Sequence, residues 1–217
     1  VLRGPQSALW GSDALAGVIG IQTRRATQPF EAEILGEGGS FGTGAGSVRL
    51  GSAGDSYDVA LAASYLSTQG INIAEEGDEE DGYKNLTLSL VGSVLPAENL
   101  EIGWAGRFVT GNNEFDDSDP TGENTENETD MRTVLGRVYG KLSLMDGAWE
   151  HILSTSGLDS ARDNDPDGSF ADTYGANLRV SYQTNLFIDT PEVADAAHTL
   201  SLKVERDHET FKQKGLP

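Results

Sequence analysis

The stretch YDVALAASYLST, residues 57–68, alternates large apolar side chains with small or polar ones. In an extended strand, successive side chains point to opposite faces, so residues two apart share a face. One face therefore carries Tyr57, Val59, Leu61, Ala63 and Tyr65. The other face carries Asp58, Ala60, Ala62 and Ser64. A strand with one apolar and one small, polar face is predicted here.

The same alternation recurs in KNLTLSLVGSVL (84–95), LEIGWAGRFV (100–109) and ANLRVSYQTNLFID (176–189). The second face of these runs carries charged or amide side chains, such as Glu101, Arg107 and Arg179. Such side chains argue against a dry core between two sheets. A soluble β-sandwich also alternates, with its apolar residues turned inward, and it stays the alternative.

The lengths of the connections separate these two architectures. Short connections are expected at 52–56, 96–99 and 145–148, and long ones at 69–83, 111–131 and 159–173. Short turns at one end and long loops at the other are typical of an outer-membrane barrel. The pattern therefore favours an all-β fold, a transmembrane antiparallel β-barrel, over the sandwich.

Composition excludes several classes of function. The net charge of −20 disfavours nucleic acid as a partner, because a phosphate backbone would be repelled. The absence of Cys excludes disulfides and thiolate chemistry. The sequence contains no run of 18 consecutive apolar residues, so it predicts no transmembrane helix. The three His lack metal-ligand spacing, and neither a nucleophile motif nor a phosphate loop is present, so we expect neither an enzyme nor an organic cofactor.

Acidic residues concentrate in the predicted long loops, at 75–82, 114–130 and 163–168. Solvated loops are the simpler interpretation, and a cation held among the carboxylates is the alternative. The segment DNDPDG matches the first half of an EF-hand loop through Asp163, Asp165 and Asp167. Tyr174 stands where a closing Glu is needed, so this is the weaker of the metal candidates.

The opening residues RGPQSALWGSDALAGVIGIQT, 3–23, resemble the closing segment of the plug domain of TonB-dependent outer-membrane receptors. The residues that carry this motif are structural: Arg3, Gly4, Pro5, Gly11, Ser12, Asp13 and Gly17. The resemblance implies that residues 1–27 end an α+β plug and that residues 28–217 begin the barrel. We expect a fragment with about nine strands of about 22.

Within this family the chain looks most like the vitamin B12 (cobalamin) branch, whose extracellular loops bind calcium. Matching the family's ligand motifs gives Asn72, Glu79, Asp81, Asp116 and Asp130. Two of these five depart from the family's residue, because Glu79 and Asn72 stand where the family has Asp. Hard oxygen ligands from two loops suit calcium.

The resemblance implies a receptor and transporter of the bacterial outer membrane for energy-coupled uptake of a scarce nutrient. Cobalamin is the first candidate for this nutrient. Its implied partners are a corrinoid, outer-membrane lipid, and the TonB complex, reached through an N-terminal segment outside this chain. A ferric siderophore or haem receptor is one alternative. A soluble β-rich calcium-binding module is the other.

Overall fold

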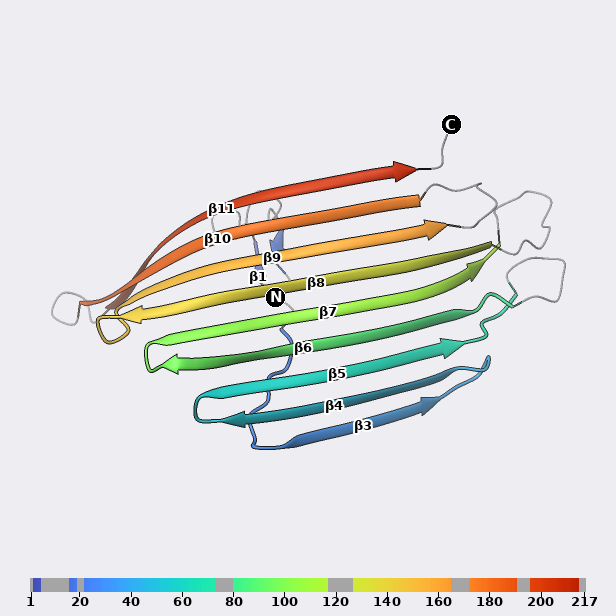
Figure 1. The fold of residues 1–217 in the computed structure, drawn as a ribbon, viewed down its shortest axis with the longest axis horizontal. Helices are drawn as coiled ribbons and strands as arrows, with labels where there is room; N and C mark the ends of the chain where they lie inside the picture. Colours follow the sequence, from blue (N-terminus) through green and yellow to red (C-terminus); the bar gives the residue numbers. More distant parts are fainter. Residues whose placement is uncertain are drawn as a thin grey trace.

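The structure is a computed structural model, and it describes residues 2–4, 16–18, 22–72, 80–116, 127–164, 172–190 and 196–214. Nine long strands form one antiparallel sheet in which each strand pairs with its neighbours in sequence, in the order β11-β10-β9-β8-β7-β6-β5-β4-β3 (Figure 1). The strands are β3 (Glu31–Gly38), β4 (Gly44–Gly54), β5 (Tyr57–Thr68), β6 (Tyr83–Ala97), β7 (Leu100–Phe115), β8 (Asn127–Leu144), β9 (Trp149–Asn164), β10 (Asp172–Thr190) and β11 (Ala196–Lys214). The prediction of an all-β fold with about nine antiparallel strands is confirmed.

Two short strands, β1 (Leu2–Arg3) and β2 (Gly17–Val18), form a separate antiparallel pair in which Arg3 lies opposite Gly17. The backbone N–H of Gly4 donates to the carbonyl of Ala16 at 3.2 Å and extends this pair. Residues 22–30 then lead to β3 along the back of the sheet in the view of Figure 1. Among the described residues, no helix is long and apolar enough to cross a membrane.

The register places the two faces of the sheet as the alternation predicts. Leu61 on β5 lies opposite Leu50 on β4 and Leu90 on β6, so the large apolar side chains of neighbouring strands share a face. Asp58 lies opposite Ser93 on the other face. We call these the apolar face and the polar face.

The connections differ between the two ends of the sheet. Tight turns at 55–56, 98–99 and 145–148 lie at the left end in Figure 1, and the connections after β5, β7 and β9 lie at the right end. The long connections were predicted to span 111–131 and 159–173, and parts of both ranges belong to strands in the structure. The ladder continues at both, with Phe115 opposite Asn127 and Arg162 opposite Thr173, because strands can pair beyond their apolar section as long as the backbone bonds continue.

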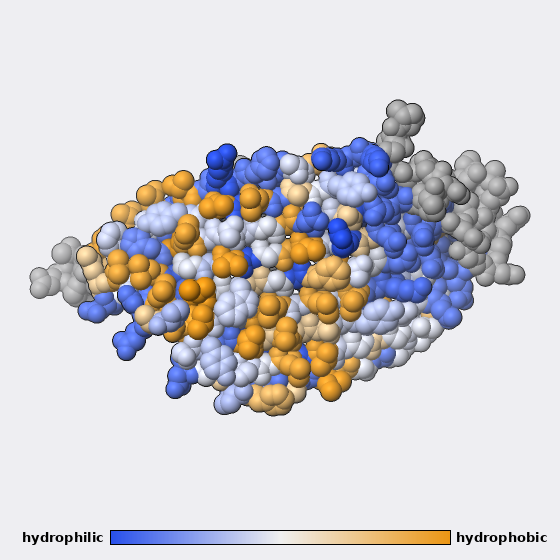
Figure 2. Space-filling model, in the orientation of Figure 1, coloured by the Kyte–Doolittle hydropathy of each residue, from blue (hydrophilic) through white to orange (hydrophobic). Residues whose placement is uncertain are grey.

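Few side chains of the described residues are buried. The apolar ones are Ala26, Ala60, Val91 and Ala161. By contrast, Leu61 is 53% exposed and Leu153 is 60% exposed, and both lie on the apolar face. Figure 2 shows this face covered by apolar side chains across its middle, with hydrophilic side chains at the end of the long connections. The sheet therefore does not build a core of its own.

Candidate functional site

An ion-paired cluster fixes the segment before β3 to the polar face of the sheet. We call this segment, residues 22–30, the linker. Arg25 donates from Nε to Oδ2 of Asp58 at 2.9 Å, and its Nη2 also contacts Oδ1 of Asp58 and Oγ of Ser93. Its Nη1 donates to Oε1 of Glu101 at 3.4 Å. One side chain of the linker thus engages strands β5, β6 and β7 at once. We call this group, together with Tyr139 and Lys141, the linker clamp.

Glu101 joins the clamp to the next strand. Its Oε1 accepts from the hydroxyl of Tyr139 at 2.7 Å, and its Oε2 pairs with Nζ of Lys141 at 2.9 Å. The register makes this contact possible, because Glu101 lies opposite Lys141 and Gly103 lies opposite Tyr139. The Glu101 side chain is only 16% exposed, so its charge depends on these three donors.

Hydrogen bonding to Asp58 raises the pKa of the Arg25 guanidinium above its ordinary value. Arg25 is therefore cationic at neutral pH. The clamp combines two cations with two carboxylates, so it is close to neutral. It has the chemistry of an anchor and not of a catalytic group, since no group in it is set to gain or lose a proton near neutral pH.

Ala26 packs the linker against the sheet. Its side chain is 5% exposed and forms a small buried cluster with Ala60 and Val91. The polar face leaves room for it because β4 carries Gly51 there, and a Cβ on Gly51 would lie 2.9 Å from the Cβ of Ala26. A second ion pair, between Arg49 on β4 and Glu31 on β3 at 2.7 Å, lies beside this contact.

Replacing Gly51 with Ala is expected to push the linker off the sheet without unfolding it. Overpacking at a tight contact costs about 1–3 kcal/mol, which would raise the open population of the linker about 5- to 150-fold. The measurement is the rate of trypsin cleavage after Arg24 and Arg25. Gly46→Ala is the control on the same strand, because its Cβ would meet only an ordinary contact, at 3.7 Å. An unchanged cleavage rate in Gly51→Ala would show that the contact between Ala26 and Gly51 does not hold the linker on the sheet.

Three of the predicted calcium ligands lie at the end of the sheet that carries the long connections. Asp81 and Asn72 come from the connection between β5 and β6, where the N–H of Asp81 donates to the carbonyl of Ile71 at 3.3 Å. Asp116 directly follows β7. One carboxylate oxygen of Asp81 and one of Asp116 are shielded from solvent. The connections are held together by Gly82, whose N–H donates to Oε2 of Glu114 at 2.9 Å.

Asp130 lies within β8 and not in a loop. Its Oδ1 accepts from Nδ2 of Asn112 at 3.1 Å, and the same amide donates to Glu128 at 3.2 Å. Asp163 lies in β9 and accepts from the hydroxyl of Tyr174 at 2.7 Å, so the residue in the place of the closing Glu contacts this carboxylate directly.

The other candidates fall elsewhere. Glu79, Asp165, Asp167, Pro5, Gly11, Ser12 and Asp13 lie outside the described residues. Within the described part, no group of three or more His, Asp or Glu side chains is close enough to hold a metal ion. The calcium set therefore stays a prediction. Of the plug motif, Gly4 and Gly17 have φ values of 92° and 152°, a region that favours glycine.

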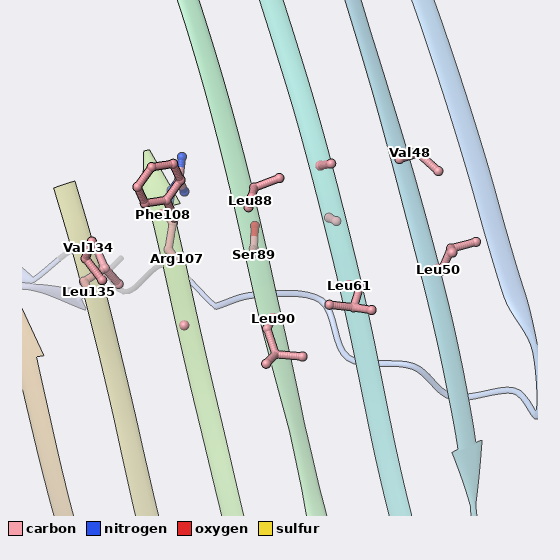
Figure 3. A pocket seen from close by; sticks show the side chains of 13 residues that line it. Val48, Leu50, Leu61, Leu88, Ser89, Leu90, Arg107, Phe108, Val134 and Leu135 are labelled. Carbon is pink, nitrogen blue, oxygen red and sulfur yellow. The ribbon is translucent and has the colours of Figure 1, made fainter. Parts of the chain in front are cut away.

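The apolar face carries a shallow groove of about 410 Å³ over β4 to β8. Figure 3 shows Leu50, Leu61 and Leu90 on three adjacent strands, with Phe108 and Val134 beyond them. Its lining has little polar surface, apart from Ser89 and Arg107. An open apolar groove of this kind suits contact with an apolar environment and not the binding of a polar solute.

The linker clamp is the site that the sequence did not predict. Asp58 and Glu101 stand out as carboxylates on the polar face of alternating strands, which is a visible signal. Their meeting with Arg25 depends on register and on the path of the linker, and neither can be read from periodicity.

Comparison with known proteins shows a similarity over part of the chain. No protein-family model matches the sequence. Over 124 residues, 54% of this chain, the sequence is 33% identical to the vitamin B12 transporter BtuB of Photobacterium profundum. The match covers 20% of that transporter, so the chain spans about a fifth of the length of its relative.

Proposed function

We propose that the nine-stranded sheet is part of the wall of a β-barrel in the bacterial outer membrane, with the apolar face toward lipid. One observation carries the proposal: the middle of one face of long antiparallel strands presents large, exposed apolar side chains, while the opposite face presents ion pairs and hydroxyls. A water-soluble protein rarely leaves so continuous an apolar surface uncovered. A barrel wall in lipid has this arrangement.

Aromatic side chains support the same orientation. Tyr57 and Trp149 lie on the apolar face at the end with the tight turns, and Tyr65 and Tyr174 lie on it toward the long connections. Along β5, Tyr57 and Tyr65 are about 26 Å apart at about 3.3 Å per residue. Aromatic girdles flank the apolar band of outer-membrane barrels in this way.

The function proposed for the whole protein is energy-coupled uptake of cobalamin, as in TonB-dependent receptors. The similarity to a vitamin B12 transporter and the plug-like opening residues support it. In this proposal residues 1–27 end the plug, the linker clamp ties the plug to residues 28–217 of the barrel, and the TonB complex is the energy-coupling partner. The role is transport and not catalysis.

Calcium is proposed to order the connections beyond β5 and β7. Asp81, just before β6, and Asp116, just after β7, bring solvent-shielded carboxylate oxygens to this end of the sheet, and Asn72 follows Ile71, whose carbonyl accepts from the N–H of Asp81. Glu79 and Asp130 are the other members of the proposed set, and Asp130 would have to leave its hydrogen bond with Asn112 to join it. Calcium takes six to eight such ligands in flexible geometry.

The test is calorimetry of cyanocobalamin binding to the full-length protein in detergent, with and without calcium. We expect calcium to strengthen binding, and Asp81→Ala and Asp116→Ala to remove at least about tenfold of that gain, or about 1.4 kcal/mol. Asp55→Ala, in an exposed turn at the opposite end, is the control and should keep the gain.

The outcomes separate the parts of the proposal. Corrinoid binding that ignores calcium would leave the transporter and refute the calcium site. Binding of a ferric siderophore or haem in place of cyanocobalamin would keep the barrel and change the solute. A protein that stays monomeric in water without detergent would refute the barrel and favour the soluble calcium-binding module.

A further inference from the structure

A polar pocket of about 370 Å³ lies on the polar face over β8 to β11 and adjoins the linker clamp along β8. Three cationic side chains line it, Arg137, Arg179 and Lys203. Three hydroxyls line it as well, from Ser154, Ser156 and Ser181. The acidic balance of the whole chain makes a cationic pocket an exception that calls for a ligand.

The register explains how the two guanidinium groups meet. Arg137 on β8 lies opposite Ser156 on β9, and Ser156 lies opposite Arg179 on β10. Their backbones are thus two strand spacings apart, about 10 Å. Both side chains point to the same face, so their forks can approach one anion from two sides.

Two of the three cations are paired with carboxylates that lie outside the lining of the pocket, and the third is not, within the described part of the chain. Arg179 donates from Nε to Asp207 at 2.7 Å, and Lys203 pairs with Glu205 at 2.7 Å. Both carboxylates lie on β11 and neither lines the pocket. Arg137 makes no ion pair with a described residue, and its guanidinium lies 5.2 Å from the ring centre of Tyr139, a member of the linker clamp. The pocket therefore keeps about one net positive charge.

We propose that this pocket is a subsite for a phosphate group carried by a small solute. The guanidinium fork of Arg137, the donors that Arg179 and Lys203 have left beyond Asp207 and Glu205, and three hydroxyls can surround a tetrahedral oxyanion, which has more acceptor positions than a carboxylate. The hydroxyls of Ser154 and Ser181 lie 2.8 Å apart and each can turn toward the anion. The inference rests on the proposed function only in taking this face as the side along which the solute passes.

The first test does not depend on transport. Inorganic phosphate is titrated into the full-length protein in detergent at constant ionic strength, and the width of its ³¹P resonance is followed. We expect broadening that Arg137→Gln weakens at least about tenfold. Arg132→Gln is the control on the same strand but on the apolar face, where Arg132 pairs with Asp159.

Equal loss in both variants, or no broadening with wild-type protein, would overturn the subsite.

The second test separates this inference from the proposed function. Cyanocobalamin contains a phosphodiester, and dicyanocobinamide lacks it. We expect Arg137→Gln to weaken binding of the first about tenfold and to leave the second unchanged. A protein that binds neither corrinoid but broadens the phosphate signal through Arg137 keeps the subsite and loses the cobalamin proposal. Equal weakening of both corrinoids refutes the subsite.

Discussion

The variant Leu61→Arg is expected to destabilise the lipid-inserted protein by about 2–4 kcal/mol, the cost of an arginine near the midplane of the lipid face of a barrel. Leu61 lies in a row with Leu50 and Leu90 at the centre of the apolar face and is 53% exposed. In water the same exchange at so exposed a position would change stability by less than about 0.5 kcal/mol. The prediction therefore tests the environment of the face and not only its packing.

The measurement is equilibrium unfolding of the full-length protein in lipid vesicles with guanidinium chloride. Ser64→Arg is the matched control, because Ser64 lies on the same strand and faces the polar side. We expect Ser64→Arg to cost much less than Leu61→Arg. Similar stabilities for wild type and Leu61→Arg would show that lipid does not cover the apolar face.

The variant Glu101→Gln is expected to cost about 2–4 kcal/mol, somewhat below the roughly 3–5 kcal/mol that is usual for a broken buried pair, because Arg25 is 39% exposed. Glu101 accepts from Arg25, Tyr139 and Lys141. A neutral amide removes the charge from all three contacts and leaves the clamp with two cations, Arg25 and Lys141, and one carboxylate, Asp58. The linker should then detach and expose the buried Ala26.

Unfolding and trypsin cleavage after Arg25 measure this effect together. Glu33→Gln is the control, since its pair with Arg24 at 3.0 Å joins side chains that are 62% and 67% exposed and should contribute less than about 1 kcal/mol. A double-mutant cycle with Arg25→Gln should show coupling between Arg25 and Glu101. Additive effects would mean that the clamp is not one unit.

Alternation along single strands was enough to predict the two faces of the sheet. Leu61, Leu90 and Trp104 lie on the face that periodicity assigned to them, because the side-chain period of a strand is two whatever its neighbours are. The tight turns at 55–56 and 145–148 were also predictable, since short polar segments with Gly or Asp interrupt the alternation there.

Contacts between strands could not be predicted in this way. The linker clamp requires Asp58 to face Ser93 and Glu101 to face Lys141, and a shift of one residue would turn either pair apart. The cationic pocket depends on the same information for Arg137 and Arg179. For Asp130, the sequence predicted a loop ligand but did not show that β8 continues past it.

The outer edges of β3 and β11 have no partner among the described strands, and each therefore requires a particular kind of neighbour. Glu37 on β3 and Asp207 and Glu209 on β11 stand on the polar face at these edges. A strand that placed a carboxylate opposite any of them would lose stability, since like charges directly across a strand pair repel. The negative charge at the two edges thus favours neighbouring strands that carry basic or neutral side chains there. It also disfavours pairing between two copies of the same edge.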